Sequence, residues 1–255
     1  MPLLFPVWRI RSDFGLTFFL LPFSFFLHPF LVRLIVFDLD GTLIDSKRDL
    51  ADAINALLVE LGADALPIDQ VAEMIGDGAA VLVRRALTAS GLSADTPDAL
   101  NRFLGLYDDR LIAHTEPYDG IQAVLEALKG SCSLAVLTNK PARATTIILE
   151  QLRLSTYFDQ VVGGDSQFGR KPDPAGLLHL VHEAGSRPDA TVLVGDSPID
   201  LETARRANTH ICLARYGFGF RFRDADFRGT ELFVDRPADL PRVLASLRAC
   251  AADPS

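Results

Sequence analysis

An apolar run that ends in two acids constrains the fold of this chain more than any other feature. Residues 34–37 are all apolar, and Asp38, Asp40 and a Gly-Thr turn follow them directly. A short apolar run bounded by turn residues is typical of a buried parallel strand. Ligands of open α/β sheets bind beyond the carboxyl ends of the strands. The sequence therefore predicts Asp38 and Asp40 at the active-site edge of a sheet, although an acid pair alone could also cap the next helix.

A second apolar run also ends in an acid, and the two runs together imply a cation. Residues 191–195 precede Asp196, and Asp200 follows about one helical turn later. Carboxylates that converge at one sheet edge repel each other unless a cation lies between them. Ligands that are all oxygen atoms favour a hard ion, and Mg²⁺ is the usual choice where a phosphate completes the coordination.

Two further segments supply groups suited to a phosphate. The apolar run 134–137 is followed by Thr138 and Asn139, which offer a hydroxyl, an amide and main-chain N–H groups. Lys171 lies in a proline-flanked segment, and the prolines stiffen the approach of this cation. Taken singly, Thr138 and Asn139 could cap a helix and Lys171 could be a solvated loop lysine. Their order along the chain, with three motifs at strand ends, favours phosphate chemistry.

These motifs are similar to those of the haloacid dehalogenase-like superfamily of phosphotransferases, and the resemblance covers roughly residues 33–245. The matching segments are Asp38-Leu39-Asp40-Gly41-Thr42, Thr138-Asn139, Lys171-Pro172 and Gly195-Asp196-Ser197-Pro198-Ile199-Asp200. More narrowly, the chain resembles the phosphoglycolate phosphatase family in three segments: IGDGAAVLVRRAL at 75–87, HTEPYDG at 114–120 and VGGDS at 162–166. The narrower resemblance implies hydrolysis of 2-phosphoglycolate to glycolate and phosphate.

The superfamily resemblance implies a role for each motif residue. Asp38 would be the nucleophile that forms an aspartyl-phosphate, and Asp40 would protonate the leaving oxygen and then deprotonate the hydrolytic water. Mg²⁺ would be held by the Asp38 carboxylate, the Asp40 carbonyl and Asp196. Asp200 would orient the metal ligands or Lys171. Charge on the transferring phosphoryl group would be stabilised by Thr138, Asn139 and Lys171.

The rest of the chain predicts an α/β fold. Alternating strand and helix patterns after Tyr118 indicate βαβ units, and so a parallel sheet with helices on both faces. The predicted elements are strands at 133–138, 160–163, 191–195 and 210–213, helices at 142–152, 174–184 and 199–207, and a final helix that includes residues 240–247. The segment before Tyr118 is helical, with helices predicted at 67–75, 79–90 and 97–113 after a first amphipathic helix.

The resemblance identifies this helical segment as a cap domain, inserted after the first strand of a Rossmann-like core. We therefore expect a core domain of residues 32–45 and 116–250 and a cap domain of residues 46–115. Residues 45–46 and 115–118 would form the two hinge strands. Residues 1–31 would be a separate apolar extension.

Substrate specificity is expected to come from the cap. Gly76 and Gly78 open a helix that carries Arg85, and a glycine-flanked helix N-terminus is suited to anions. This segment could hold a substrate carboxylate. The alternative is a plain turn followed by solvated arginines, and Asp77 would oppose a carboxylate unless its side chain pointed away.

The composition narrows the partners and the compartment. The formal charge is −8, without a run of Lys or Arg, which argues against nucleic acid. A small anionic phosphate monoester is the expected partner, attracted by local positive groups and the metal. The three cysteines are scattered and show neither CxxC spacing nor a disulfide framework, which fits a cytoplasmic protein. Both a monomer and a homodimer are compatible with the sequence.

The first 31 residues differ in composition from the rest and contain eight of the 17 phenylalanines. Residues 16–32 are almost wholly apolar but are interrupted by Pro22 and Pro29, which counts against a transmembrane helix. No small-residue cleavage site follows, as a signal peptide would require. We favour an over-extended start, with a native N-terminus near Val32. A membrane or targeting segment and a genuine appendage stay open.

Two other classes of function compete with the phosphoglycolate phosphatase. A phosphomutase, or a phosphatase of another small phosphate such as a sugar phosphate, would share the core and differ in the cap. A non-catalytic, membrane-associated binding protein would use the apolar N-terminus, but it would be expected to have lost at least one of Asp38, Asp40, Lys171 and Asp196. A dehalogenase is disfavoured because that chemistry needs neither Asp40 nor a metal.

Overall fold

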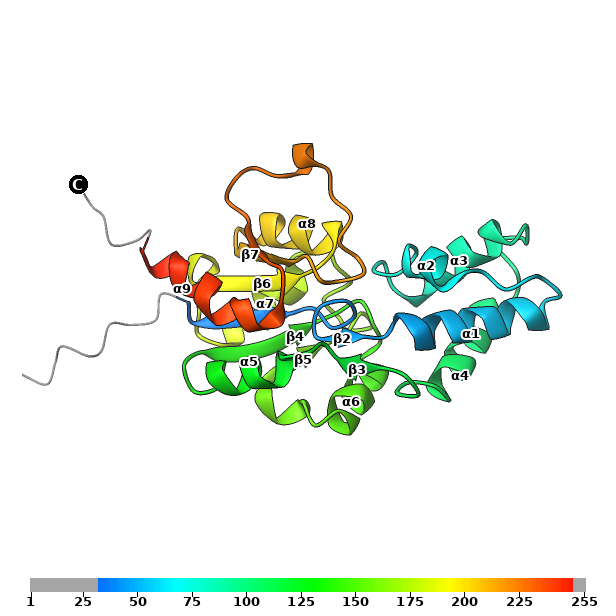
Figure 1. The fold of residues 1–255 in the computed structure, drawn as a ribbon, viewed down its shortest axis with the longest axis horizontal. Coiled ribbons are helices and arrows are strands. Elements are labelled where there is room, and N and C mark those ends of the chain that lie inside the picture. Colours follow the sequence, from blue (N-terminus) through cyan, green and yellow to red (C-terminus); the bar gives the residue numbers. More distant parts are fainter. Residues whose placement is uncertain (1–31, 250–255) are drawn as a thin grey trace, which may run out of the picture.

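A parallel sheet of six strands forms the centre of the computed structural model, which describes residues 32–249 (Figure 1). The strand order is β5-β4-β1-β6-β7-β8, so the first strand of the chain lies in the middle of the sheet. The strands are β1 (Leu34–Phe37), β4 (Ser133–Leu137), β5 (Gln160–Val162), β6 (Thr191–Gly195), β7 (His210–Ala214) and β8 (Leu232–Val234).

Alternation along β1 distributes its side chains between two apolar layers. Ile35 and Phe37 belong to one cluster of buried side chains, and Leu34 and Val36 belong to the other. The first cluster includes residues of α5 (Ile121–Leu128), α6 (Ala142–Gln151) and α9 (Leu240–Ala249), and the second includes residues of α7 (Ala175–Glu183) and α8 (Pro198–Ala207). Short 3₁₀ turns lie at Ser155–Tyr157, Pro188–Ala190, Asp224–Asp226 and Pro237–Asp239.

The strand register places the predicted catalytic residues at one edge. Phe37, the last residue of β1, pairs with Val136 on β4 and with Val194 on β6. The residues that follow these three positions therefore leave the sheet side by side. Asp38 is the first of them, and Thr138 and Asp196 lie one residue further along their own strands.

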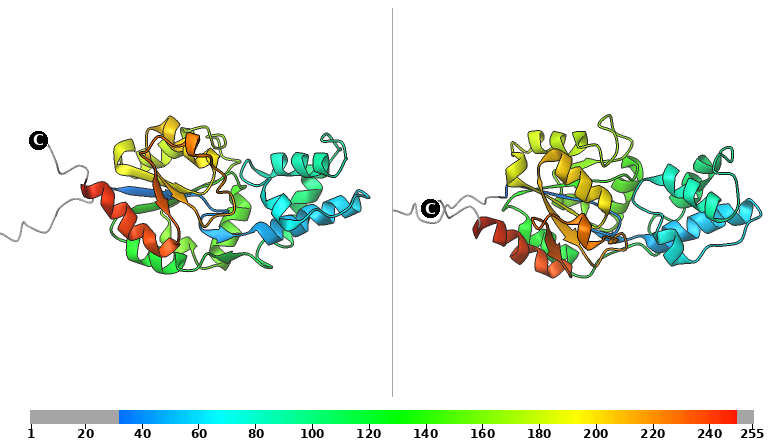
Figure 2. Two further views of the ribbon diagram at one scale, coloured as in Figure 1. Left: turned by 45° about the horizontal axis from the view of Figure 1, so that its top comes forward. Right: turned by 90° about the horizontal axis from the view of Figure 1, so that it is seen from above.

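Four helices form a cap at one end of the molecule, opposite α9 (Figures 1 and 2). The chain enters the cap through β2 (Ile44–Asp45) and returns through β3 (Glu116–Pro117), which pair antiparallel. The Asp49 carboxylate, buried at the start of the first cap helix, accepts the main-chain N–H groups of His114 and Thr115. The helices are α1 (Lys47–Glu60), α2 (Ile68–Ala72), α3 (Ala79–Ala89) and α4 (Ala99–Asp108).

The structure confirms the predicted α/β class with a helical insertion, and each predicted core element agrees within one residue. The strand β8 was not predicted, because its three apolar residues follow a long polar segment. The helix predicted over 97–113 ends at Asp108, where Arg110 donates its N–H to the Tyr107 carbonyl and tightens the last turn. The division into a core domain of residues 32–45 and 116–250 and a cap domain of residues 46–115 stays a prediction.

Two further predictions about the cap differ from the structure. The helix predicted over 67–75 covers only Ile68–Ala72, because the chain turns toward Gly76, which has a φ of +124°. The hinge pairing lies one residue earlier than predicted, at Ile44 and Asp45. Ser46 instead precedes α1 as its N-cap residue.

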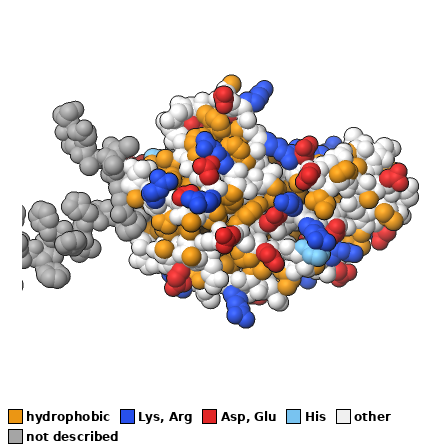
Figure 3. Space-filling model, viewed as in Figure 1, with side chains coloured by type: hydrophobic (Ala, Val, Ile, Leu, Met, Phe, Trp, Pro, Cys, Tyr) orange, Lys and Arg blue, Asp and Glu red, His pale blue; other side chains and the backbone are white. Residues whose placement is uncertain are grey.

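Surface charge and hydropathy carry little information about partners. On the face seen in Figure 3, acidic and basic side chains of the described residues are interspersed, without a basic stripe. None of the helices within residues 32–249 is long and apolar enough to span a membrane. The interpretations of the apolar N-terminal segment concern residues that lie outside this range, apart from Val32.

Candidate active site

A buried lysine between two carboxylates forms the floor of the site. Lys171 Nζ lies 2.7 Å from Asp38 Oδ1 and 2.6 Å from Asp200 Oδ1, and all three residues are buried. The other oxygen of Asp200 accepts hydrogen bonds from the N–H and the hydroxyl of Ser197, at 3.0 and 2.6 Å. Both Asp200 oxygens are thus committed to partners within the protein. Its position suits a residue that orients Lys171.

Asp196 is enclosed by loops whose backbones approach it closely. Gly219 donates its N–H to Asp196 Oδ2 at 2.7 Å, and the Thr42 hydroxyl lies 3.4 Å from the other oxygen. A Cβ atom added at Gly41 or Gly217 would come within 2.4 Å of the Asp196 side chain, so no larger residue fits at either position. The loop after β7 therefore encloses this carboxylate.

Three acids meet at this sheet edge, and their charge is not balanced by the protein. Carboxylate oxygens of Asp38, Asp196 and Asp200 lie within 4.8 Å of one another. Burial raises the pKa of Asp38 to about 7, although Lys171 opposes the shift. Burial, with the nearby charges of Asp200 and Asp38, raises the pKa of Asp196 well above its ordinary value. A hard cation with oxygen ligands, such as Mg²⁺, fits this donor set and would relieve the repulsion.

Asp40 lies beside this cluster and is held by two other side chains. Lys140 Nζ donates to both Asp40 oxygens, at 2.8 and 2.9 Å, and the Ser46 hydroxyl donates to Oδ1 at 2.5 Å. The side chains of Lys140 and Asp40 are 4% and 13% exposed, so this is an almost buried ion pair. Asp40 is thereby oriented both by Lys140 of the core and by Ser46, the N-cap residue of the first cap helix.

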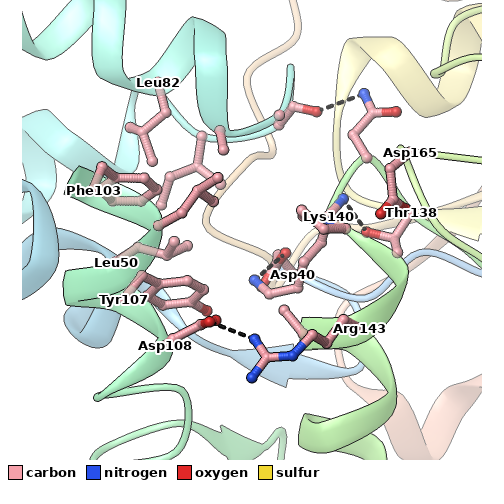
Figure 4. A pocket seen from close by; sticks show the side chains of 18 of the residues that line it. Asp40, Leu50, Leu82, Phe103, Tyr107, Asp108, Thr138, Lys140, Arg143 and Asp165 are labelled. Atoms are coloured by element: carbon pink, nitrogen blue, oxygen red, sulfur yellow. Dashed lines mark hydrogen bonds and ion pairs between the residues drawn. The ribbon is translucent and has the colours of Figure 1, made fainter. Parts of the chain in front are cut away.

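A cavity of about 270 Å³ separates these groups from the cap. Its core side carries the polar residues Asp40, Thr138 and Lys140 (Figure 4). Opposite them, the cap helices contribute a mainly apolar wall. The labelled apolar and aromatic side chains of that wall are Leu50, Leu82, Phe103 and Tyr107, and Asp108 of α4 is its labelled acid.

The chain is similar to known proteins both in sequence and in fold. The model of the haloacid dehalogenase-like hydrolases matches residues 35–214. The chain belongs to this family of hydrolases. The phosphoglycolate phosphatase of Pseudomonas putida is 39% identical over 210 residues, which cover 80% of this chain and 77% of that protein. The phosphoglycolate phosphatase of Aquifex aeolicus is 36% identical over 215 residues, covering 84% of this chain and 97% of that protein.

A solved structure of similar fold carries the same description as these sequence relatives. The crystal structure of a protein from Haemophilus somnus, described as a predicted phosphoglycolate phosphatase, superposes with a TM-score of 0.77 at 32% sequence identity. The match covers 84% of this chain and 98% of that protein. The hydrolase fold and the helical cap of this family member are therefore shared with proteins described as phosphoglycolate phosphatases.

The cap residues predicted to bind substrate lie in two different settings. Gly76 and Gly78 line the cavity of this hydrolase. Arg85 does not line it, because Arg85 Nη1 is held 2.6 Å from Asp77 Oδ2 and donates to the Met74 carbonyl at 3.0 Å. The arginine stabilises the glycine loop from outside. A direct contact of Arg85 with substrate stays a prediction.

Asn139 lies at the predicted place, but its amide is already bonded. Its Nδ2 donates to the carbonyls of Gly76 and Lys171, at 3.0 and 3.1 Å. The side chain thus ties the cap loop to the lysine loop instead of offering N–H groups to a phosphate. Thr138, by contrast, lines the cavity, and its hydroxyl accepts the N–H of Lys140 at 3.2 Å.

Sequence reasoning missed the residues that connect cap and core at the cavity. Lys140 directly follows Thr138 and Asn139, so a longer reading of that motif could have found it. Tyr107 lies on the apolar face of α4, where its pattern is that of an ordinary core residue. Arg143 of α6 forms an ion pair with Asp108 of α4, and the sequence carried no signal for this contact.

Proposed function

We propose that this hydrolase is a Mg²⁺-dependent phosphatase that converts 2-phosphoglycolate to glycolate and phosphate. The cluster of Asp38, Lys171 and Asp196 beneath a small capped cavity carries the proposal. The relatives described as phosphoglycolate phosphatases support the choice of substrate. A cytoplasmic location, as monomer or homodimer, belongs to the same proposal.

Asp38 is the proposed nucleophile. Its carboxylate attacks phosphorus, the bond from phosphorus to the ester oxygen breaks, and an aspartyl-phosphate forms. Lys171, only 2.7 Å from this carboxylate, holds it in place and faces the charge of the phosphoryl oxygens. Thr138 offers a hydroxyl from the neighbouring strand end to the same oxygens.

Asp40 is the proposed acid and base. It donates a proton to the departing ester oxygen and so releases glycolate, and it then accepts a proton from the water that hydrolyses the aspartyl-phosphate. The two steps leave Asp38 and Asp40 as they began. Ser46 and Lys140 hold the Asp40 side chain in the cavity wall.

The metal would be held by the Asp38 and Asp196 carboxylates and the Asp40 carbonyl. When bound, it supplies positive charge that neutralises the phosphate and the converging carboxylates. Gly219 and Thr42 orient Asp196 for this role, and Asp200 acts through Lys171.

A substrate panel tests the proposal. Purified enzyme with Mg²⁺ is assayed for phosphate release from 2-phosphoglycolate and from sugar phosphates such as glucose 6-phosphate. We expect the largest kcat/KM for 2-phosphoglycolate. A higher kcat/KM for a sugar phosphate would instead support the alternative function, a sugar phosphatase. Transfer of the phosphate within a sugar, without its release, would indicate a phosphomutase.

A further inference from the structure

The proposed substrate has a second anionic group, and the site must bind it. Asp38, Lys171 and Thr138 account for binding of its phosphate, but no group has yet been assigned to its carboxylate. The described residues that line the cavity include two cations, Lys140 and Arg143. The inference that follows rests on the proposed function and concerns which of these groups recognises the carboxylate.

Lys140 lies beside Asp40, where the covalent structure of 2-phosphoglycolate also brings the substrate carboxylate. Asp40 protonates the ester oxygen, and the carboxylate carbon of 2-phosphoglycolate is only two bonds from that oxygen. A cation bound to Asp40 is therefore necessarily near the substrate carboxylate. Lys140 Nζ, at 2.8 and 2.9 Å from the Asp40 oxygens, is such a cation.

Tyr107 adds a hydrogen-bond donor from the cap. Its ring centre lies 4.8 Å from Lys140 Nζ, and the residue is 4% exposed. Within residues 32–249, its buried O–H has no acceptor, because the neighbouring Lys140 ammonium can only donate to it, and Tyr107 lines the cavity. Burial raises the pKa of Tyr107 to about 12, so the hydroxyl keeps its proton near neutral pH. A buried hydroxyl without an acceptor, on a residue that lines a cavity, needs one, and the substrate can supply it.

We propose that Lys140 and the Tyr107 hydroxyl together form the subsite for the substrate carboxylate. Arg143 is a poorer candidate because its side chain is 70% exposed and already paired with Asp108. Arg85 lies outside the cavity. The subsite joins a core residue to a cap residue, so the carboxylate is bound only when cap and core meet as they do in this structure.

The apolar cap wall explains why the subsite favours a small acid. Leu82 and Phe103 lie opposite Asp40 and Lys140 and offer no hydrogen-bond partner (Figure 4). A sugar would have to bury several hydroxyl groups against this wall, and each unpaired hydroxyl weakens binding. A two-carbon acid places its only other polar group at Lys140 and Tyr107.

The test uses the Tyr107→Phe variant of the full-length enzyme with Mg²⁺. This substitution removes only the hydroxyl and keeps the ring beside Lys140. The kcat/KM values are measured for 2-phosphoglycolate and for 2-hydroxyethyl phosphate, in which an alcohol replaces the carboxylate. We expect the ratio of the two values to fall roughly 10- to 100-fold, because a hydrogen bond to a charged group is lost. The loss should lie mainly in KM for 2-phosphoglycolate.

Tyr157→Phe is the matched control. Tyr157 also lies beside a lysine, with Lys129 Nζ 5.3 Å from its ring centre, but it is not among the residues that line the cavity. This variant should keep the wild-type ratio. An unchanged ratio in Tyr107→Phe, or equal losses on both substrates, would overturn the subsite while leaving the proposed function intact. A wild-type enzyme without preference for 2-phosphoglycolate would overturn both.

Discussion

Buried carboxylates in two regions of the core have pKa shifts of opposite direction. Glu231, directly before β8, is 8% exposed. It accepts hydrogen bonds from the main-chain N–H groups of Arg228 and Gly229 and forms an ion pair with Arg205. Burial alone would raise its pKa, but these donors lower it overall. Asp38 and Asp196, at the catalytic edge, have a raised pKa although Lys171 lies among them.

The difference separates structural carboxylates from catalytic ones. The structural glutamate is saturated with donors, so its charge is stabilised by the fold itself. The acids of the catalytic edge share too few donors, and a bound cation would stabilise their charge. The fold therefore holds Asp38 and Asp196 in a costly arrangement that ligands relieve.

Asp38→Asn should have the largest effect on activity. The substitution keeps the shape of the side chain but removes the attacking charge and one metal ligand. We expect kcat to fall by about 10³-fold or more, as for other nucleophile replacements. Circular dichroism should show an unchanged fold. Activity within about tenfold of wild type would exclude Asp38 as the nucleophile, since an activated carboxylate cannot be replaced by an amide.

Removal of the metal should abolish turnover and should also lower the Tm of the protein. A chelator should eliminate activity and Mg²⁺ should restore it, whereas Ca²⁺ should inhibit because its larger coordination shell misplaces the phosphate. Independently of activity, Mg²⁺ should raise the Tm of the chelator-treated wild type. It should not raise the Tm of Asp196→Asn. Full activity in excess chelator would contradict the proposed metal dependence.

Stability of the metal-free protein should depend on pH through Asp38. Its pKa is about 7 in the fold and near its ordinary value of 3.8 in the unfolded chain, so the folded state binds more protons between these values. Stability conferred by this group therefore falls as pH rises through that window. In chelator, Asp38→Asn should have a higher Tm than wild type at pH 7.5, and the difference should shrink toward pH 4.5. A constant difference would show that Asp38 does not titrate in this range.

Much of this site could be predicted from the sequence, and the failures have a common cause. Asp38 and Asp196 follow apolar runs, and the strand order of a parallel sheet brings such ends together without further information. The position of Tyr107 at the cavity and the pairing of Arg85 with Asp77 were not predicted, because both depend on which way a cap helix faces the core. That orientation is set by contacts between distant residues, such as Asn139 with Gly76. The local periodicity of the sequence carries no information about such long-range contacts.

Glu231→Gln should lower stability without affecting the site. The amide loses the charge that the surrounding donors stabilise, and we expect a loss of about 2 kcal/mol in the free energy of unfolding at pH 7. Because the folded pKa of Glu231 is lowered, this contribution is present above about pH 4.5 and is lost as pH falls through the folded pKa. Denaturant unfolding measures both. Glu202→Gln, which removes an exposed pairing with Arg206, is the control and should cost less than about 0.5 kcal/mol.

Arg85→Gln should have the smallest effect, because the Arg85 guanidinium pairs neither with Glu231 nor with the acids of the catalytic edge. Its partner Asp77 is partly exposed, and the ion pair only braces the glycine loop outside the cavity. We expect kcat/KM for 2-phosphoglycolate to change less than about threefold, since exposed ion pairs contribute little. A rise in KM of tenfold or more, with kcat unchanged, would instead place the Arg85 guanidinium on the substrate carboxylate. In that case the cap would have to rearrange on binding, and the division between a charged core and an apolar cap wall would no longer hold.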